Sequence, residues 1–285
     1  MAQAFLRTPI EKALAYALLI VLGFLMIFPF IWMFTASLKP HADIVQVLDV
    51  SLFPKGSPAQ WLWGNYAEVL SIVPIGTQLI NSVIVTVGVS VGQILTSILA
   101  GYAFARIPFP GRDSLFSAYL GTLMVPFAVL LVPMYQLMIW LGWVDHLVAL
   151  IVPWLFTAYG TFLLRQAFMA LPKELEEAAM MDGTSRWGAL FRIYVPLVNP
   201  AIATLGTIAF LYSWNSFTWP LIVINNRDLK VVTQGLMDLQ ALYGGTRLDL
   251  VMAGSVMAVL PTLLIYLFFQ RYFIEGVASS GMGGR

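Results

Sequence analysis

The sequence predicts an all-α protein that crosses a membrane with six transmembrane helices, and three observations lead to this prediction. The chain of 285 residues is 60% hydrophobic and only 10% charged, whereas an ordinary soluble domain is about 25% charged. Six stretches free of Lys, Arg, Asp and Glu reach ~18 residues or more, the length that a membrane-spanning helix needs. Cations also concentrate in alternate connections between these stretches.

The charge-free stretches give the order of the expected helices, because a charge at the bilayer centre is costly and a span needs ~20 apolar residues. The stretches are 13–38, 69–105, 114–144, 146–164, 193–226 and 250–270. The second, third and fifth exceed one span, and within them we expect helices near 76–103, 115–138 and 200–222. The first run is too long for a signal peptide, so we expect it to be retained as a helix.

The distribution of Lys and Arg predicts the orientation of the chain. Ten of these 15 cations lie in the terminal segments and the even-numbered connections. Cytoplasmic loops carry an excess of Lys and Arg, so both termini and the 171–198 connection are predicted to be cytoplasmic. The connections 39–74, 139–147 and 224–249 are then external, and residues 1–285 form a single transmembrane domain.

Several classes of protein are excluded by residues that the sequence lacks. The chain has no cysteine, which excludes disulfides and thiolate sites, and its net charge of +1 gives no footprint for nucleic acid. His41 and His146 are the only histidines and fall in different predicted loops without metal-ligand spacing, so we expect solvated loop residues, no catalytic site and no metal site. No Gly-Lys dipeptide is present, which excludes a P-loop.

Two glycines in the second predicted span, Gly88 and Gly92, form a small-xxx-small pair. Such a pair allows another helix to approach closely. We expect it to serve packing within this chain rather than a dimer interface.

The cytoplasmic connection 171–198 is too structured for a passive linker and predicts two short helices. Pro172 suits a first helical position, and Gly183 supplies a left-handed stop. Ser185 is expected to cap the second helix and Pro196 to end it.

The residues alone leave two interpretations of the first of these helices. Ala178 and Ala179 would give it a small, flat surface for another protein, with adaptable apolar contacts from Met180 and Met181. A helix lying in the membrane interface would explain the same pattern.

The loop resembles the EAA loop of bacterial ABC importer permeases, whose pattern is EAA, three residues, Gly, nine residues, then I-x-L-P. The matching residues are Glu177, Ala178, Ala179, Gly183, Ile193 and Pro196, and Val195 stands where the pattern has Leu. The resemblance covers nearly the whole chain and is to the MalG-like subunits of carbohydrate importers. Other similar segments are 37–39, 65–66, 81–82, 101–106, 109–112, 162–166, 214–215 and 270–273.

The resemblance implies a type I ABC importer permease fold in the bacterial cytoplasmic (inner) membrane. It implies a second, MalF-like permease subunit, two copies of an ABC ATPase and an extracytoplasmic solute-binding protein as partners. ATP and Mg would be bound by the ATPase subunits and no cofactor by this chain. The 224–249 connection resembles the external loop that reaches into the binding protein. The implied ATPase-coupling residues are Glu177, Ala178, Ala179, Asp182, Gly183, Ile193 and Pro196.

The predicted helix cores contain no acid or base, which argues against an ion-driven secondary transporter built on membrane carboxylates. An uncharged lining of amides and aromatic rings suits sugars and polyols, although each candidate can instead form a helix–helix hydrogen bond. A glycerol-phosphate importer and, less strongly, a secondary transporter remain alternatives. The candidate lining residues are Asn81, Gln93, Tyr135, Gln136, Asn199, Tyr212, Trp214 and Asn215.

Overall fold

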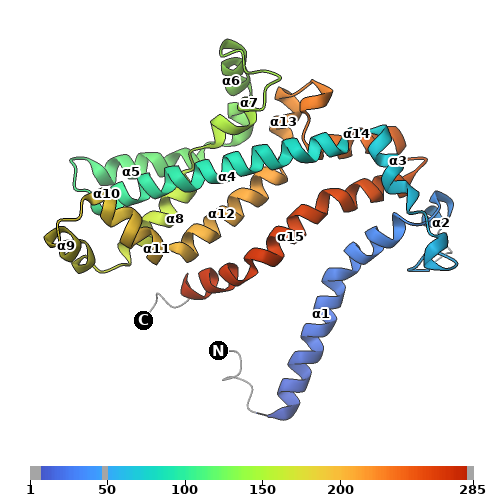
Figure 1. Cartoon of the computed structure of the whole chain (residues 1–285), viewed down its shortest axis with the longest axis horizontal. Coiled ribbons are helices and arrows are strands. Elements are labelled where there is room, and N and C mark those ends of the chain that lie inside the picture. The colour runs from blue at the N-terminus through green and yellow to red at the C-terminus, as the bar shows by residue number, and fades with distance from the viewer. Residues whose placement is uncertain (1–7, 47–50, 281–285) are drawn as a thin grey trace. The chain divides into compact units, whose positions relative to one another are not determined.

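The computed structural model describes residues 8–46 and 51–280, and this part of the chain contains helices and no strand (Figure 1). Two compact units are present: Met1–Val73 with Leu236–Val259, and Pro74–Gly235 with Leu260–Arg285. The fold class predicted from the sequence is confirmed. A single transmembrane domain over 1–285 stays a prediction.

Three helices are long and apolar enough to cross a membrane without interruption. They are α1 (Pro9–Ala36), α4 (Ile75–Arg106) and the Leu248–Ile265 part of α15 (Leu248–Ser280). Three further pairs of helices pass the same test together but are bent at a short break. The described residues therefore contain three spans, or up to six if each bent pair is one span, and the exact count of six stays a prediction.

The prediction of one continuous helix over 115–138 is wrong. The chain forms α5 (Arg112–Gly121), a short 3-10 turn and α6 (Phe127–Trp140), and the direction changes by 97° between the two halves. Pro126 explains the position of the break, because the ring of a proline disfavours helical geometry in the residue before it. Val125 accordingly has extended backbone, with ψ of 117°.

The helix expected over 200–222 is also interrupted. It is divided into α12 (Asn199–Trp214) and α13 (Thr218–Val223). Asn215 ends α12, and its side-chain amide donates to the carbonyl oxygen of Leu211 at 2.8 Å. The Asn215 N–H donates to the same carbonyl oxygen at 3.1 Å and makes the last helical hydrogen bond of α12.

The first unit joins the end of α1 to α3 (Gly64–Ile72). Asn65 Nδ2 donates to the carbonyl oxygen of Ser37 at 2.8 Å, and the hydroxyls of Ser37 and Tyr66 are 2.8 Å apart. Two short segments singled out by the resemblance therefore meet here.

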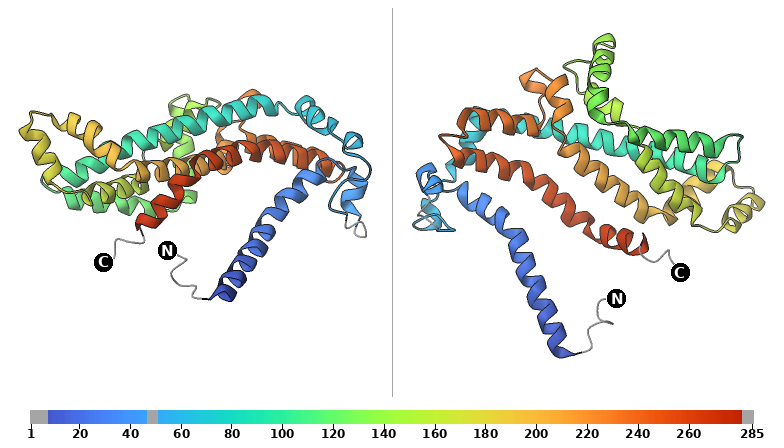
Figure 2. Two further views of the ribbon diagram at one scale, coloured as in Figure 1. Left: turned by 60° about the horizontal axis from the view of Figure 1, so that its bottom comes forward. Right: turned by 180° about the vertical axis from the view of Figure 1, so that it is seen from behind.

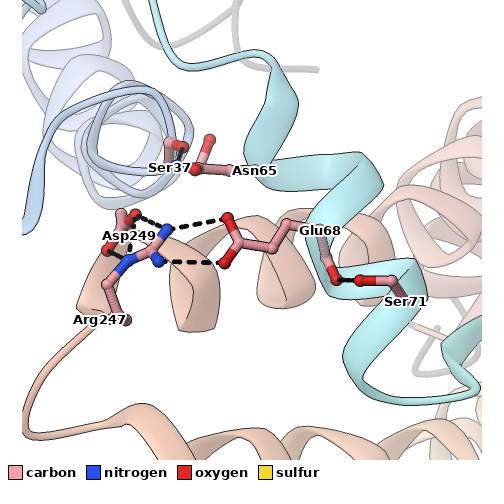
Figure 3. Close-up of polar contacts among 6 residues, drawn as sticks. All are labelled: Ser37, Asn65, Glu68, Ser71, Arg247 and Asp249. Carbon is pink, nitrogen blue, oxygen red and sulfur yellow. Dashed lines mark hydrogen bonds and ion pairs between the residues drawn. The ribbon is translucent and has the colours of Figure 1, made fainter.

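An ion-pair cluster joins α3 to the start of α15 within the same unit. Arg247 lies between the carboxylates of Glu68 and Asp249, with contacts of 3.0 Å to each (Figure 3). The Asp249 side chain is only 1% exposed, and a buried carboxylate needs such a partner. The hydrogen bonds to Asp249 and then to Glu68 raise the pKa of Arg247, so the guanidinium stays charged.

The expectation that His41 is a solvated loop residue is wrong. His41 begins α2 (His41–Val45), is half-buried, and its Nδ1 accepts a hydrogen bond from the Leu248 N–H at 2.9 Å. His146 is exposed, as expected.

The second unit is built around α4, which packs against α8 (Ala158–Met169) and α12 (Figures 1 and 2). Gly88 and Gly92 face Ile151 and Leu155, so closely that an added Cβ at Gly92 would lie within 2.2 Å of the Leu155 side chain. The small-residue pair thus serves packing within the chain, as predicted.

Candidate functional site: the 171–198 loop and its attachment

The first helix of the loop is α9, which covers Glu174–Met181. Its first turn carries three glutamates, which favour the positive end of the helix dipole. Lys173 is the N-cap, so the prediction that Pro172 takes the first helical position is wrong. Pro172 lies immediately before the N-cap and outside the helix. A proline disfavours helical geometry in the residue before it, and here that residue is not part of a helix.

Gly183 ends α9 in the left-handed conformation, with φ of 77°, as the sequence predicted. The Gly183 N–H donates to the carbonyl oxygen of Met180 at 3.0 Å, and the Thr184 N–H donates to that of Ala179 at 2.9 Å. These bonds satisfy carbonyls that the end of a helix leaves without a partner. Asp182 is the C-cap residue and is exposed.

The second helix begins where expected and continues to Leu197. Ser185 caps α10 (Arg186–Ala189), because its Oγ accepts from the Gly188 N–H at 3.2 Å. A π-helical turn, η5 (Leu190–Tyr194), containing the half-buried Ile193, leads into α11 (Val195–Leu197). The helical stretch from Arg186 ends at Leu197, one residue after Pro196, and a bend of 78° separates it from α12, so the expected stop is confirmed to within one residue.

The two alanines of the EAA sequence lie on different faces of α9. Ala178 is exposed, together with Glu174, Glu177 and Met181, which follow one another at helical spacing on the outer face. Ala179 is buried, at 6% exposure. The expectation that both alanines form one outer surface is wrong, because a helix turns by about 100° between neighbouring residues.

The inner face of α9 is attached to two other helices through Glu176, a contact that sequence reasoning missed. Its Oε1 accepts from the hydroxyl of Tyr102 at the end of α4, at 3.1 Å. Its Oε2 accepts from the hydroxyl of Tyr194 in η5, at 3.3 Å. Tyr102 lies in the 101–106 segment and Tyr194 in the 171–198 loop, and the family resemblance had identified both segments. Their presence in these segments was the sequence signal that could have revealed the contact.

The two tyrosine rings belong to a buried aromatic cluster with Phe168 of α8. The ring centroids of Tyr102 and Tyr194 are 5.6 Å apart, and each lies about 6 Å from Phe168, at 5.9 and 6.1 Å. Edge-on arrangements at these distances are favourable for aromatic pairs. The cluster fixes the position of the hydroxyls that Glu176 meets.

Arg106, the last residue of α4, joins this cluster to the end of α8. Its Nη2 donates to the carbonyl oxygens of Phe168 and Leu171, both at 2.6 Å. Its guanidinium lies 5.0 Å from the centre of the Tyr194 ring, within the range of a cation–π contact. The chain that leads from α8 to α9 is thus held against the end of α4.

Among the candidate pathway residues, Asn81 and Gln93 hold the backbone of other segments. Asn81 Nδ2 donates to the carbonyl oxygens of Asp228 and Lys230, at 2.8 and 3.0 Å. Gln93 Nε2 donates to that of Trp154 at 2.9 Å. Both side chains therefore have a structural use, and contact with a solute stays a prediction.

The other candidates differ in exposure. Trp214 is buried and stacks on Phe210, with ring centroids 5.6 Å apart. Asn215 and Gln136 are exposed. Neither of the two cavities described along α4 is lined by these residues or by Asn81.

A groove with a volume of about 460 Å³ lies between α4 and α12 and includes Ile265 of α15. Most of its lining is apolar, and the polar contributions come from Ser90, Asn199 and Thr207. Within the described residues, the buried Ser90 Oγ has no hydrogen-bond partner. Buried hydroxyls are normally paired, so this unpaired atom is an exception.

Residues 93–279 match the model of a family described as the binding-protein-dependent transport system inner membrane component. The chain belongs to this family. The match covers more than half of the chain and includes Tyr102, Arg106 and the entire 171–198 loop.

Members of this transport family are similar to the chain over almost its full length. The arabinooligosaccharides transport system permease protein AraQ of Halalkalibacterium halodurans is 34% identical, covering 92% of this chain and 93% of the relative. The lactose permease protein LacG of Rhizobium radiobacter is 34% identical, covering 96% and 98%. The sn-glycerol-3-phosphate permease protein UgpE of Pectobacterium atrosepticum is 33% identical, covering 93% and 95%.

Two solved structures share the fold of this family member. A chain of a bacterial ABC transporter involved in the import of the acidic polysaccharide alginate has a TM-score of 0.78 at 22% identity, covering 94% of this chain and 99% of that one. A second structure, of a bacterial alginate ABC transporter in complex with an alginate pentasaccharide-bound periplasmic protein, has a TM-score of 0.63. The chain is a multi-pass membrane protein and a permease subunit of a transport system.

Proposed function

We propose that this chain forms half of the translocation pathway of an ATP-driven importer for a sugar or oligosaccharide. In this proposal the outer face of α9 docks on a cytoplasmic ATPase. The observation that carries it is the exposure of Glu177, Ala178 and Met181 on one face of a short helix whose sequence resembles the EAA loop.

The exposed face of α9 has the properties of a docking surface. Met181 is 89% exposed, and a flexible thioether is well suited to contacts with another protein. The small side chain of Ala178 leaves room for close approach, and Glu177 beside it offers a charge for a basic partner. Gly183 ends α9 and Ser185 caps α10, so the turn between the two helices has a defined conformation. Asp182, Ile193 and Pro196 complete the proposed coupling segment.

The proposed assembly contains a second permease, two ATPase subunits that bind ATP and Mg, and an extracytoplasmic solute-binding protein. The family description, which names binding-protein-dependent transport, supports these partners. A chain without a P-loop needs a partner to hydrolyse ATP. Both termini and the 171–198 loop then lie on the cytoplasmic side of the inner membrane, and 39–74 and 224–249 lie outside.

Two relatives named for oligosaccharides or lactose support a carbohydrate as the solute. A glycerol-phosphate solute is the second candidate, since UgpE is almost equally similar. The groove between α4 and α12 favours the uncharged solute, because its polar lining residues are hydroxyls and one amide rather than cations. Asn81, Gln136, Trp214 and Asn215 remain proposed pathway residues outside this groove.

Uptake by cells with and without this chain tests the proposal. We expect loss of the chain to abolish uptake of a labelled arabinooligosaccharide or lactose. Uptake should survive a protonophore as long as cellular ATP is maintained. Uptake that collapses with the ion gradient at constant ATP would overturn the ATP-driven mechanism. Loss of labelled glycerol 3-phosphate uptake alone would instead assign the second candidate solute.

A further inference from the structure

Glu176 stands apart from the other two glutamates of the first turn of α9. Glu174 and Glu177 are exposed, whereas Glu176 is half-buried and turned toward the body of its unit. We infer that Glu176 is a positioning residue that transmits movement of α9 to α4 and to η5 through the hydroxyls of Tyr102 and Tyr194. This inference rests on the proposed function, because it concerns what happens after the ATPase moves α9.

The attachment of α9 to the rest of its unit depends strongly on this one carboxylate. Ala179 is the only fully buried residue of α9. Within the described residues, Glu176 is also the only side chain of α9 that forms hydrogen bonds with other elements. Its two oxygens meet hydroxyls from two different elements, α4 and η5. A displacement of α9 therefore acts on both at once.

The tyrosines that receive this movement are rigidly held. Tyr102 is 4% exposed and Tyr194 is fully buried, and both rings pack against Phe168. Arg106 lies over the Tyr194 ring and binds the end of α8. Closely packed interiors transmit strain instead of absorbing it. The two hydroxyl–carboxylate contacts, at 3.1 and 3.3 Å, join α9 directly to both elements, so a displacement can pull as well as push.

The movement is expected to reach the groove between α4 and α12. Tyr102 lies near the end of α4, and Val91 lies three turns earlier on the same helix, where it is 49% exposed and lines the groove. A long, continuous helix carries a displacement at one end to the other. Val91 is therefore a suitable reporter position for movement that begins at α9.

The natural absence of cysteine allows a direct test in the intact complex, purified through a tag on this chain. A single cysteine, Val91→Cys, is alkylated with and without ATP and vanadate. We expect the nucleotide to change the alkylation rate in the otherwise unaltered chain. Glu176→Ala should abolish this change, whereas the charge-matched control Glu11→Ala, at an exposed position of α1, should retain it. Tyr102→Phe should weaken the change and add nothing when combined with Glu176→Ala.

The outcomes separate this inference from the proposed function. A complex without an ATPase subunit, or without any nucleotide effect at Val91→Cys in the unaltered chain, would count against the proposed function itself. A nucleotide effect that persists in both Glu176→Ala and Tyr102→Phe would overturn the inference and leave the function standing. A third outcome is that Glu176→Ala loses the ATPase subunit, whereas Tyr102→Phe keeps both the subunit and the nucleotide effect. This outcome would assign Glu176 to docking and would also overturn the inference.

Discussion

Gly183 takes the left-handed conformation at the point where α9 turns into the second helix of the loop. The space around its Cα is open, so the backbone angle alone restricts this position. A residue with a Cβ pays ~1–2 kcal/mol there, although Asn adopts this conformation more readily. We expect Gly183→Val to lower transport-coupled ATPase activity and Gly183→Asn to preserve most of it. Equal activity in the two variants would contradict the importance of this angle.

Arg247 is the residue on which the ion-pair cluster with Glu68 and Asp249 depends. Removing the Arg247 side chain leaves the buried Asp249 carboxylate without its cation. Loss of one partner from a buried ion pair lowers the free energy of unfolding by ~3 kcal/mol. Removing Glu68, which is 42% exposed, leaves Arg247 paired with Asp249 and costs ~1 kcal/mol or less. Thermal unfolding in detergent should therefore show a clearly larger loss for Arg247→Ala than for Glu68→Ala. Similar thermal unfolding midpoints for the two variants would show that the Asp249 carboxylate does not need Arg247 as its partner.

At the scale of single residues, the sequence predicts those features of a helix end that depend only on neighbouring residues along the chain. The stop at Gly183 and the cap at Ser185 are local features and were predicted correctly. The burial of Ala179 and the two partners of Glu176 depend on how α9 is rotated against the rest of its unit. No local pattern specifies that rotation.

At the scale of helices, α4 and α8 cross closely at Gly101, where an added side chain would make a tight contact. A Cβ at Gly101 would lie 3.0 Å from the backbone nitrogen of Arg165, and backbone cannot rotate away as a side chain does. We expect Gly101→Ala to destabilise the protein by ~1–3 kcal/mol, as overpacking does. Gly23→Ala in α1, where nothing lies within 4 Å, is the matched control. An equal unfolding temperature for both variants would refute this close packing.

The breaks within the helices were the least predictable elements. Pro29, Pro133 and Pro261 lie inside helices that continue past them, whereas Pro126 lies at a bend of 97°. The residue type is the same in all four places, so composition and spacing identify a possible break but not its outcome.

At the scale of the whole molecule, charge spacing predicted a helical membrane protein, and the resemblance predicted its transport family. Both predictions are confirmed, the first by the helices and the second by the family match. The orientation of the chain and its place in an assembly depend on the membrane and on other subunits. The orientation and the assembly stay predictions because the structure of one chain contains neither the membrane nor the other subunits.

Site-specific cross-linking from α9 tests the central claim most directly, since any introduced cysteine is the only one in the chain. We expect Met181→Cys, on the exposed face, to cross-link to an ATPase subunit in membranes. Ala179→Cys, on the buried face of the same helix, should not. Cross-linking of Met181→Cys to lipid reagents alone, with no ATPase adduct, would contradict the claim that α9 docks on the ATPase.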